Sequence, residues 1–134
     1  MQKSFFLNLR VDNLKRTVAF FKALGFEFNP KFTDENATCM IINDDCFVMF
    51  LIPKFFDGFS KKPAYNSKES SAGLYAISLE SKDEVNRIAN KALTLGATEP
   101  HVLEDLGFMF SRSIEDFDGH QWDFFYMDDL KDPV

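Results

Sequence analysis

Lys22-Ala-Leu-Gly-Phe26 and Ala92-Leu-Thr-Leu-Gly-Ala97 decide the fold, because they end two amphipathic helical patterns in the same way. In each stretch a leucine precedes a glycine, and glycine accepts the left-handed conformation that ends a helix at little cost. Strand-like residues follow both glycines. The simplest account is an internal duplication, in which one supersecondary unit occurs twice within 134 residues.

The residues around the first helix exit predict one strand, one helix and three more strands. The apolar stretch 4–11 is long enough for a strand, and Asp12 supplies an N-cap oxygen for a helix that begins near Asn13. The apolar stripe of this helix consists of Leu14, Val18 and Phe21. The three strands are predicted at 26–33, 37–42 and 47–52, with polar turns at 34–36 and 43–45.

The second half repeats this order. A strand is predicted at 73–79, and Ser81 with Glu84 forms a capping box at the start of a helix that Gly96 ends. Strands are then predicted at 97–99, 108–114 and 121–127, and Asp118-Gly119 is the strongest hairpin signal. Two β-α-β-β-β units favour an α+β fold over a doubly wound parallel sheet.

The chain is expected to form a single domain, residues 1–134, with module one at about 1–58, a connecting segment at about 59–72 and module two at about 73–134. The polar stretch 53–72 contains Phe55, Phe56 and Phe59. Exposed phenyl rings cost solvation free energy, so this stretch is either a lid or docking segment or an ordinary loop that packs on the core. The residues leave both readings open.

Composition restricts the partners. The formal charge is −6 and no run of Lys or Arg exceeds a pair, which argues against nucleic acid and against an anionic membrane surface. The 17 Phe favour a phenylalanine-rich core, with an apolar pocket or a subunit interface as the alternative. The N-terminal apolar stretch is too short for a secretion signal, and no segment has the length of a transmembrane helix.

Cys39 and Cys46 have neither zinc-finger nor C-x-x-C spacing. A turn at Asn43-Asp44 would set Cys46 opposite about Ile41, so the two cysteines would not be cross-strand neighbours. We expect both to be reduced and the compartment to be cytoplasmic.

Several stretches resemble one superfamily. Asn8-Leu-Arg-Val-Asp-Asn-Leu14, followed by Ala19-Phe-Phe-Lys-Ala-Leu-Gly-Phe26, resembles the opening module of the vicinal-oxygen-chelate proteins, which include glyoxalase I, extradiol dioxygenases, fosfomycin-resistance enzymes and bleomycin-binding proteins. Asp116-Phe-Asp-Gly-His-Gln-Trp-Asp-Phe-Phe-Tyr-Met127 is similar to their D-P-D-G-x-x-x-E signature, with Phe117 in place of Pro. Gly107-Phe-Met-Phe-Ser-Arg112 and Val48-Met-Phe-Leu51 resemble a bacterial subgroup labelled predicted lactoylglutathione lyase.

The resemblance implies two βαβββ modules that form a curved mixed sheet around a cleft, often completed in a homodimer. In metal-using members, four inward side chains bind a divalent ion. The corresponding positions here are Phe6, Met49, Leu74 and Asp123. Only Asp123 suits a hard or borderline cation, because phenyl and isobutyl groups have no lone pair and a thioether prefers soft ions. We therefore expect no metal and no other cofactor.

Two histidines do not replace the missing ligands. By strand alternation His120 points to the face opposite Asp123, and His101 lies in an irregular stretch after Pro100. Each is expected to be a surface or satisfied histidine.

The cleft would then be apolar around one carboxylate. Phe6, Met49 and Leu74 would form its floor, Leu51 and Phe125 its walls, and Asn8 a polar handle. Desolvation should raise the pKa of Asp123, so that it serves as a general acid or base or binds a ligand amine. Arg112 from the neighbouring strand is an alternative partner for Asp123, and a satisfied buried aspartate is the favoured reading.

The sequence leaves three candidate functions open. The first is a protein that binds a small, largely apolar organic molecule without a metal, and the second is a glyoxalase-type lyase, isomerase or dioxygenase that acts through Asp123. The third is an assembly protein whose cleft its own phenyl rings fill. No phosphate-binding loop, nucleophile elbow or dinucleotide-binding motif occurs in the sequence.

Overall fold

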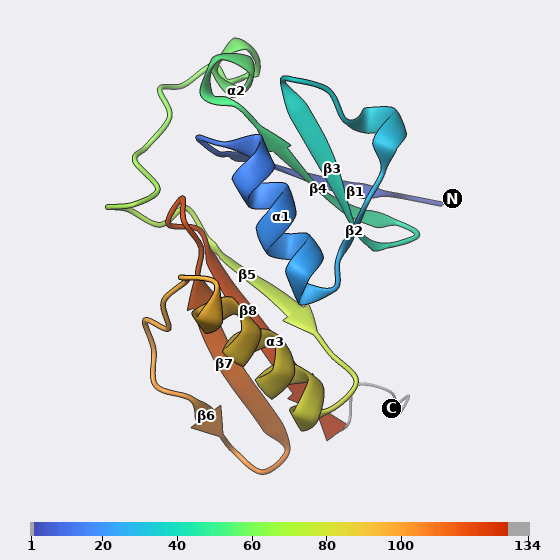
Figure 1. Ribbon diagram of the computed structural model, residues 1–134, viewed down its shortest axis with the longest axis vertical. Helices are drawn as coiled ribbons and strands as arrows, with labels where there is room; N and C mark the ends of the chain where they lie inside the picture. The colour runs from blue at the N-terminus through green and yellow to red at the C-terminus, as the bar shows by residue number, and fades with distance from the viewer. Residues whose placement is uncertain (1, 129–134) are drawn as a thin grey trace. The chain divides into compact units, whose positions relative to one another are not determined.

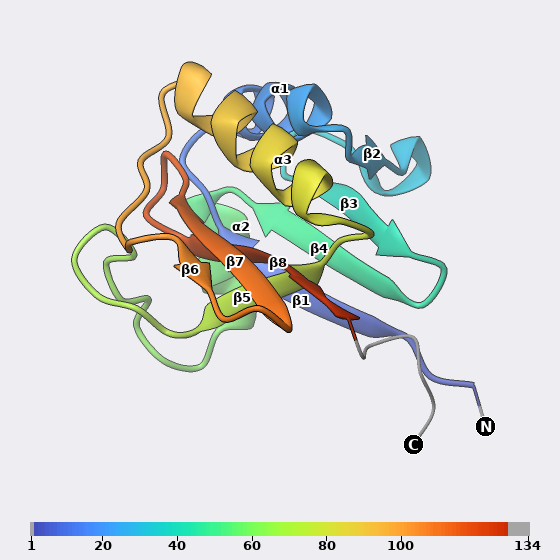
Figure 2. The ribbon, with the colours of Figure 1, turned by 90° about the horizontal axis from the view of Figure 1, so that it is seen from below.

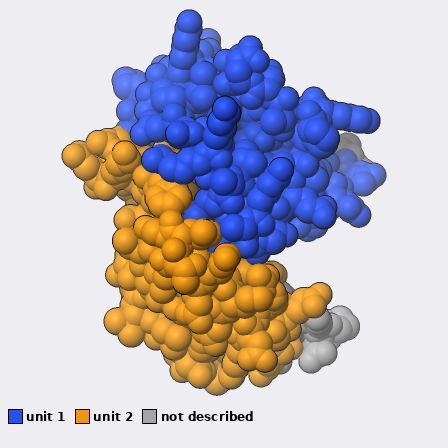
Figure 3. Space-filling view, in the orientation of Figure 1, with its two compact units in different colours: residues 1–65 blue, residues 66–134 orange. Residues whose placement is uncertain are grey.

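The computed structural model describes residues 2–128. The chain divides into two compact units, residues 1–65 and 66–134 (Figure 3). The division falls inside the predicted connecting segment. Each unit has its own four-stranded mixed sheet with the strands in the same relative order, so the expected α+β architecture of two βαβββ modules is confirmed.

The first unit contains four strands, two helices and a short 3-10 turn (Figure 1). Its elements are β1 (Phe5–Arg10), α1 (Leu14–Leu24), β2 (Glu27–Phe28), η1 (Pro30–Phe32), β3 (Ala37–Asn43), β4 (Cys46–Leu51) and α2 (Pro53–Phe59). The sheet order is β1-β4-β3-β2. The β1–β4 pair is parallel and the other pairs are antiparallel.

Helix α1 begins one residue later than the sequence predicts. Its N-cap is Asn13 rather than Asp12, because the Asn13 side chain accepts a hydrogen bond from the Arg16 amide at 3.1 Å. The helix ends at Gly25, whose φ of 106° is the predicted left-handed conformation. On its buried side, Phe21 stacks on Phe50 of β4 with ring centroids 5.3 Å apart, and this contact forms the centre of the core of the first unit.

Two predictions for the first unit are wrong. The strand expected at 26–33 stops at Phe28, because the Asn29 side chain caps the Lys31 amide and Pro30 has no N–H for a ladder. Cys46 pairs with Asn43 rather than with Ile41, since the register shifts between Ile41 and Asn43. Both cysteines are nevertheless free, as expected.

Over residues 66–128, the second unit has one helix, which packs against one face of its sheet (Figure 2). Its elements are β5 (Leu74–Ser78), α3 (Lys82–Thr94), β6 (Glu104–Asp105), β7 (Met109–Glu115) and β8 (Gln121–Met127). The order is β5-β8-β7-β6, with β5 and β8 parallel. The Ser81 hydroxyl caps α3 at the Glu84 amide, 3.1 Å away, as the capping box predicts. Gly96, with φ of 107°, follows the helix end.

The strand predicted at 97–99 does not form. Thr98 makes only an isolated bridge with Glu115, and the edge strand is Glu104–Asp105 instead. Pro100 has no backbone N–H to donate to a strand ladder, and the Glu99 side chain accepts hydrogen bonds from Arg112. The segment between Glu99 and β6 is therefore irregular, and it becomes part of the site described below.

Within residues 2–128, no helix is both long enough and apolar enough to cross a membrane. The phenylalanines divide between two environments. Phe20, Phe21, Phe50, Phe110 and Phe124 are buried, whereas Phe59 at the end of α2 is 68% exposed. The prediction of a phenylalanine-rich core therefore holds for only some of the phenylalanines.

Candidate functional site

The second sheet has one covered and one open face. Trp122 and Phe124 of β8 are buried on the face that α3 covers, together with Phe110 and Ile114 of β7. Because side chains alternate along a strand, Gln121 and Asp123 of β8 lie on the opposite face. The same alternation places Ser111 and Ser113 of β7 beside them, since Ser113 pairs with Asp123. The open face thus carries polar side chains in adjacent strands.

A pocket of about 400 Å³ lies on this open face. Strands β5, β7 and β8 supply its floor, and the irregular segment before β6 supplies a wall. The lining residues are Leu74, Pro100, His101, Val102, Glu104, Met109, Ser111, Ser113, Gln121 and Asp123. All of them belong to the second unit. The lining is more polar than the apolar cleft expected from the sequence.

Asp123 lies on the pocket floor without a partner. Among residues 2–128, no side chain or backbone group forms a hydrogen bond or an ion pair with its carboxylate. Burial raises the pKa of Asp123 above that of an exposed aspartate, while the charge of His101 lowers it and that of Glu104 raises it. The carboxylate is therefore incompletely solvated and available to a ligand.

Ser113 also has unused hydrogen-bonding capacity. Its hydroxyl oxygen is buried and has no hydrogen-bond partner within the described part of the chain. Buried hydroxyl groups are rarely left unpaired in folded proteins. Ser113 pairs with Asp123 on the neighbouring strand, and neither side chain has a hydrogen-bond partner among residues 2–128.

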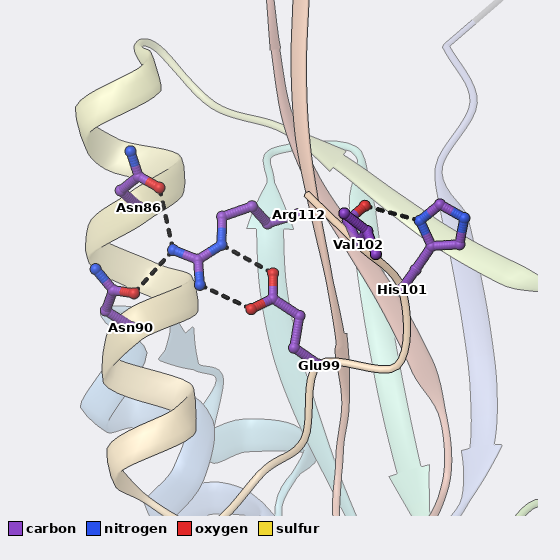
Figure 4. A network of polar contacts seen from close by, with 6 residues as sticks. All are labelled: Asn86, Asn90, Glu99, His101, Val102 and Arg112. Carbon is purple, nitrogen blue, oxygen red and sulfur yellow. Dashed lines mark hydrogen bonds and ion pairs between the residues drawn. The ribbon is translucent and has the colours of Figure 1, made fainter. Parts of the chain in front are cut away.

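Arg112 lies on the covered face of the sheet and binds Glu99, which directly precedes the pocket wall. Its Nε and Nη2 atoms donate to the two carboxylate oxygens of Glu99, each at 2.9 Å, and Nη1 donates to the side chains of Asn86 and Asn90 on α3 (Figure 4). These contacts raise the pKa of Arg112, chiefly through the hydrogen bonds to Glu99. Arg112 therefore does not pair with Asp123, which decides the question that the sequence left open.

The wall continues from Glu99 through His101. The Nδ1 atom of His101 donates to the Val102 carbonyl oxygen at 2.9 Å (Figure 4). The same atom lies 4.0 Å from the Glu104 carboxylate. The sequence predicts only a surface or satisfied histidine here. The structure adds that His101 belongs to the same pocket as Asp123.

The turn before β8 is buried and internally bonded. Asp116 accepts hydrogen bonds from the backbone amides of Asp118 and His120 and from Trp122 Nε1. Burial raises the pKa of Asp116, and His120 lowers it. His120 is buried near Tyr75 on the α3 side, so the prediction that it points away from Asp123 is confirmed. This turn sets the register from which β8 presents Asp123.

The other predicted ligand-binding residues lie outside the pocket lining. Phe125 shares the face of Asp123 by alternation but does not line the pocket. Phe6, Asn8, Met49 and Leu51 are on adjacent strands of the first sheet, where Asn8 pairs with Met49. Phe6 stacks on Phe47 at 4.7 Å, and Leu51 is only 4% exposed. The pocket around Asp123 thus contains two of the seven predicted site residues, Asp123 and Leu74.

The residues that the sequence resemblance assigns to the metal positions of the vicinal-oxygen-chelate proteins do not fit a divalent ion. Phe6 and Leu74 have no donor atoms, Met49 offers a thioether, and Asp123 is the single hard donor. Within residues 2–128, no three His, Cys, Asp or Glu side chains are close enough together to hold a metal ion.

Sequence reasoning missed most of the pocket wall and part of its floor. The alternation that exposes Asp123 also exposes Gln121. A two-residue turn at Asp118-Gly119 would pair Ser113 with Phe124, whereas the observed register pairs Ser113 with Asp123, so the turn signal did not place Ser111 and Ser113 on this face. No local pattern marks Pro100, His101 and Val102 as a wall. Their position depends on Arg112 holding Glu99 from a distant strand.

Comparisons with known proteins agree with this architecture. Residues 3–43 match the family described as bleomycin resistance protein-like N-terminal. No curated protein sequence matches the chain. A hypothetical protein from S. aureus has a similar structure, with a TM-score of 0.78 and 23% identity over 94% of this chain and 95% of that chain.

Two structures of proteins that are named for a function are also similar. A glyoxalase/bleomycin resistance protein/dioxygenase family enzyme from Burkholderia phytofirmans PsJN has a TM-score of 0.76 at 12% identity, over 94% of this chain and 99% of that chain. Fosfomycin resistance protein FosX from Mesorhizobium loti has a TM-score of 0.67 at 14% identity, over 94% and 92%. The chain therefore has the glyoxalase/bleomycin resistance/dioxygenase fold, and its residues 3–43 carry the sequence pattern of the bleomycin resistance protein-like N-terminal family.

Proposed function

We propose that this chain is a metal-independent member of the vicinal-oxygen-chelate superfamily that binds a small organic molecule in the pocket around Asp123. One observation carries the proposal: the Asp123 carboxylate lies on the floor of a pocket of about 400 Å³ with no internal partner among the described residues. A pocket of this size suits a small ligand, and a few convergent polar groups fix the orientation of such ligands.

The polar lining supports a ligand with two distinct ends. Leu74, Val102 and Met109 offer an apolar surface to one end, while Asp123 offers the other a carboxylate that has no hydrogen-bond partner among residues 2–128. The sequence alone suggests a largely apolar ligand. The proposal keeps the small organic ligand and assigns it a polar group that reaches Asp123.

The proposal does not involve a metal, because the four superfamily positions provide one hard donor between them. A divalent cation needs several convergent oxygen or nitrogen ligands. The polar side chains that line the pocket are instead two carboxylates, two hydroxyl groups, an amide and an imidazole, all from the second unit.

A fragment titration followed by two-dimensional NMR tests the proposal on the full chain. Bound fragments are expected to shift the backbone amide signals of Ser111, Ser113 and Gln121. Ser111→Phe would fill the pocket from β7 and abolish these shifts. Ser70→Phe, which adds the same side chain at an exposed loop position, is the matched control. Fragments that shift only signals elsewhere, or that bind Ser111→Phe equally well, would refute the proposal.

An enzymatic role is the second candidate, and the raised pKa of Asp123 beside His101 favours it. A carboxyl group whose pKa is raised can serve as a general acid or base. A lyase or isomerase of the glyoxalase type would turn over the methylglyoxal–glutathione hemithioacetal, and Asp123→Asn would remove that activity. Activity that survives Asp123→Asn would contradict the role of this residue.

The homodimer and the cytoplasmic location expected from the sequence stay predictions. The contributions of Phe6, Asn8, Met49, Leu51 and Phe125 to ligand binding likewise remain part of the proposal. Substitution of each by Ala, with the NMR titration as the readout, would measure whether the ligand reaches beyond the pocket.

A further inference from the structure

The ionisable side chains of the pocket are unbalanced in charge. Asp123 and Glu104 line it together with His101, and the lining contains no Lys or Arg. Even when His101 is protonated, two carboxylates outnumber one imidazolium. A carboxylate that is partly removed from water is unfavourable unless a positive group or several donors compensate it. The pocket therefore favours a ligand that brings positive charge and disfavours an anion.

The unused hydrogen-bonding groups on the floor are mainly acceptors. The Asp123 carboxylate accepts hydrogen bonds only, and no group among residues 2–128 donates one to it. A protonated amine has N–H donors and no acceptor, so its hydrogen-bonding pattern is complementary to this floor. Hydrogen bonds from an ammonium group to a carboxylate are about twice as strong as neutral ones.

Apolar side chains border the same pocket and are exposed. Leu74 is 66% exposed and Val102 is 84% exposed. Burial of such surface by a ligand is favourable, at roughly 25 cal/mol for each Å² removed from water. The two features together describe a ligand with a positive head and an apolar body.

Building on the proposed function, we infer that the pocket selects a small primary amine in its protonated form. The ammonium group lies at the carboxylates of Asp123 and Glu104. The apolar body of the amine covers Leu74, Val102 and Met109. The pocket thus recognises the charge of the head group at its floor and the apolar body of the amine beside it.

A matched series of three probes tests this inference by NMR titration of the full chain. The probes are 2-phenylethylammonium, 2-phenylethanol and 3-phenylpropanoate, which share a phenyl body and differ in the charge of the head group. We expect the ammonium probe to bind at least about tenfold more tightly than the alcohol, a ratio equivalent to about 1.4 kcal/mol. The carboxylate probe is expected to bind most weakly.

Substitutions locate the charge that produces the preference. Asp123→Asn should lower the affinity for the ammonium probe toward that for the alcohol and leave alcohol binding nearly unchanged. Asp123 has no internal hydrogen bond within residues 2–128, so Asn is expected to be tolerated at this position. Glu104→Gln tests the second carboxylate. Glu69→Gln removes an equal charge from an exposed loop of the same unit and should have no effect.

The outcomes separate this inference from the proposed function. If all three probes shift the amides of Ser111, Ser113 and Gln121 with equal affinity, the pocket binds small molecules and the selection for a cation is wrong. Tighter binding of the carboxylate probe, or an unchanged preference in Asp123→Asn, would also overturn it. If no probe shifts these signals, both the inference and the proposed function fail.

Discussion

Replacing Gly119 by Ala is expected to destabilise the second unit, because the added methyl group would meet backbone atoms. Gly119 has a φ of +86°, and a Cβ atom built on it would overlap the Ser67 carbonyl oxygen and lie 2.7 Å from Lys68 Cα. The Ser67 hydroxyl fixes this backbone by donating to the Asp118 carbonyl oxygen at 2.5 Å. Neither partner is the flexible end of a side chain, so the loop or the turn must move.

The expected loss is the sum of a conformational cost and a packing cost. A residue with a Cβ atom pays roughly 1–2 kcal/mol in the left-handed region, and the lower entropy of the unfolded chain returns about 0.4–1 kcal/mol. Forcing a methyl group into packed surroundings adds about 1–3 kcal/mol, and losing the Ser67 hydrogen bond adds about 1 kcal/mol. Gly119→Ala should therefore lower the free energy of unfolding by about 2–6 kcal/mol.

Gly107→Ala is the matched control. Gly107 has a φ of +84°, yet nothing lies within 4 Å of a Cβ atom built on it. This variant carries the conformational cost alone, about 1 kcal/mol. The difference between the two variants therefore isolates the contact with Ser67 and Lys68.

Guanidinium unfolding followed by tryptophan fluorescence measures both variants. Trp122 is the single tryptophan of the sequence and is 1% exposed in the core of the second unit, so its emission reports on that unit. Equal losses in Gly119→Ala and Gly107→Ala would refute the packing of the Ser67 segment against this turn. The consequence would reach the site, because the turn sets the register of β8 and so the position of Asp123.

Three further predictions concern the charged groups. Because burial raises the pKa of Asp123, the folded chain holds this proton more tightly than the unfolded chain, and the free energy of unfolding falls as the pH rises from the ordinary aspartate pKa through the raised one. Denaturant titrations across this range should lack that component in Asp123→Asn, and identical pH profiles would contradict the raised pKa. Arg112→Met leaves the Glu99 carboxylate without its bidentate partner and should lower the free energy of unfolding by about 3–5 kcal/mol in the same measurement. Arg87→Met, at an exposed pair, should lower it by at most about 1 kcal/mol. Equal losses in the two variants would show that the Glu99 contact is not a buried one. Elemental analysis of purified protein should find far less than one equivalent of tightly bound divalent metal, and about one Zn²⁺, Ni²⁺ or Fe²⁺ per chain would overturn the metal-independent proposal.

Much of the fold could be predicted because its signals are local. The helix ends at Gly25 and Gly96, the Ser81 cap and the strand at 121–127 each follow from a few neighbouring residues, and the structure confirms them. The failures occurred where a side chain competed with the backbone ladder. The Asn29 side chain caps a turn and ends the strand predicted at 26–33. The Glu99 side chain binds Arg112, and the strand predicted at 97–99 does not form.

The resemblance assigns four metal positions, and the sequence alone shows that three of them carry apolar side chains, because the donor atoms of a side chain are fixed by its identity. The sequence also identifies Asp123 as the one hard donor among them. Which groups surround that carboxylate was decided only by the tertiary structure. Strand register sets Ser113 beside Asp123, and the Arg112–Glu99 contact fixes the segment that brings His101 to the same pocket. These neighbours come from different segments of the chain. Local periodicity gives the face of the sheet on which a side chain lies. It does not give the residue that another segment places next to that side chain.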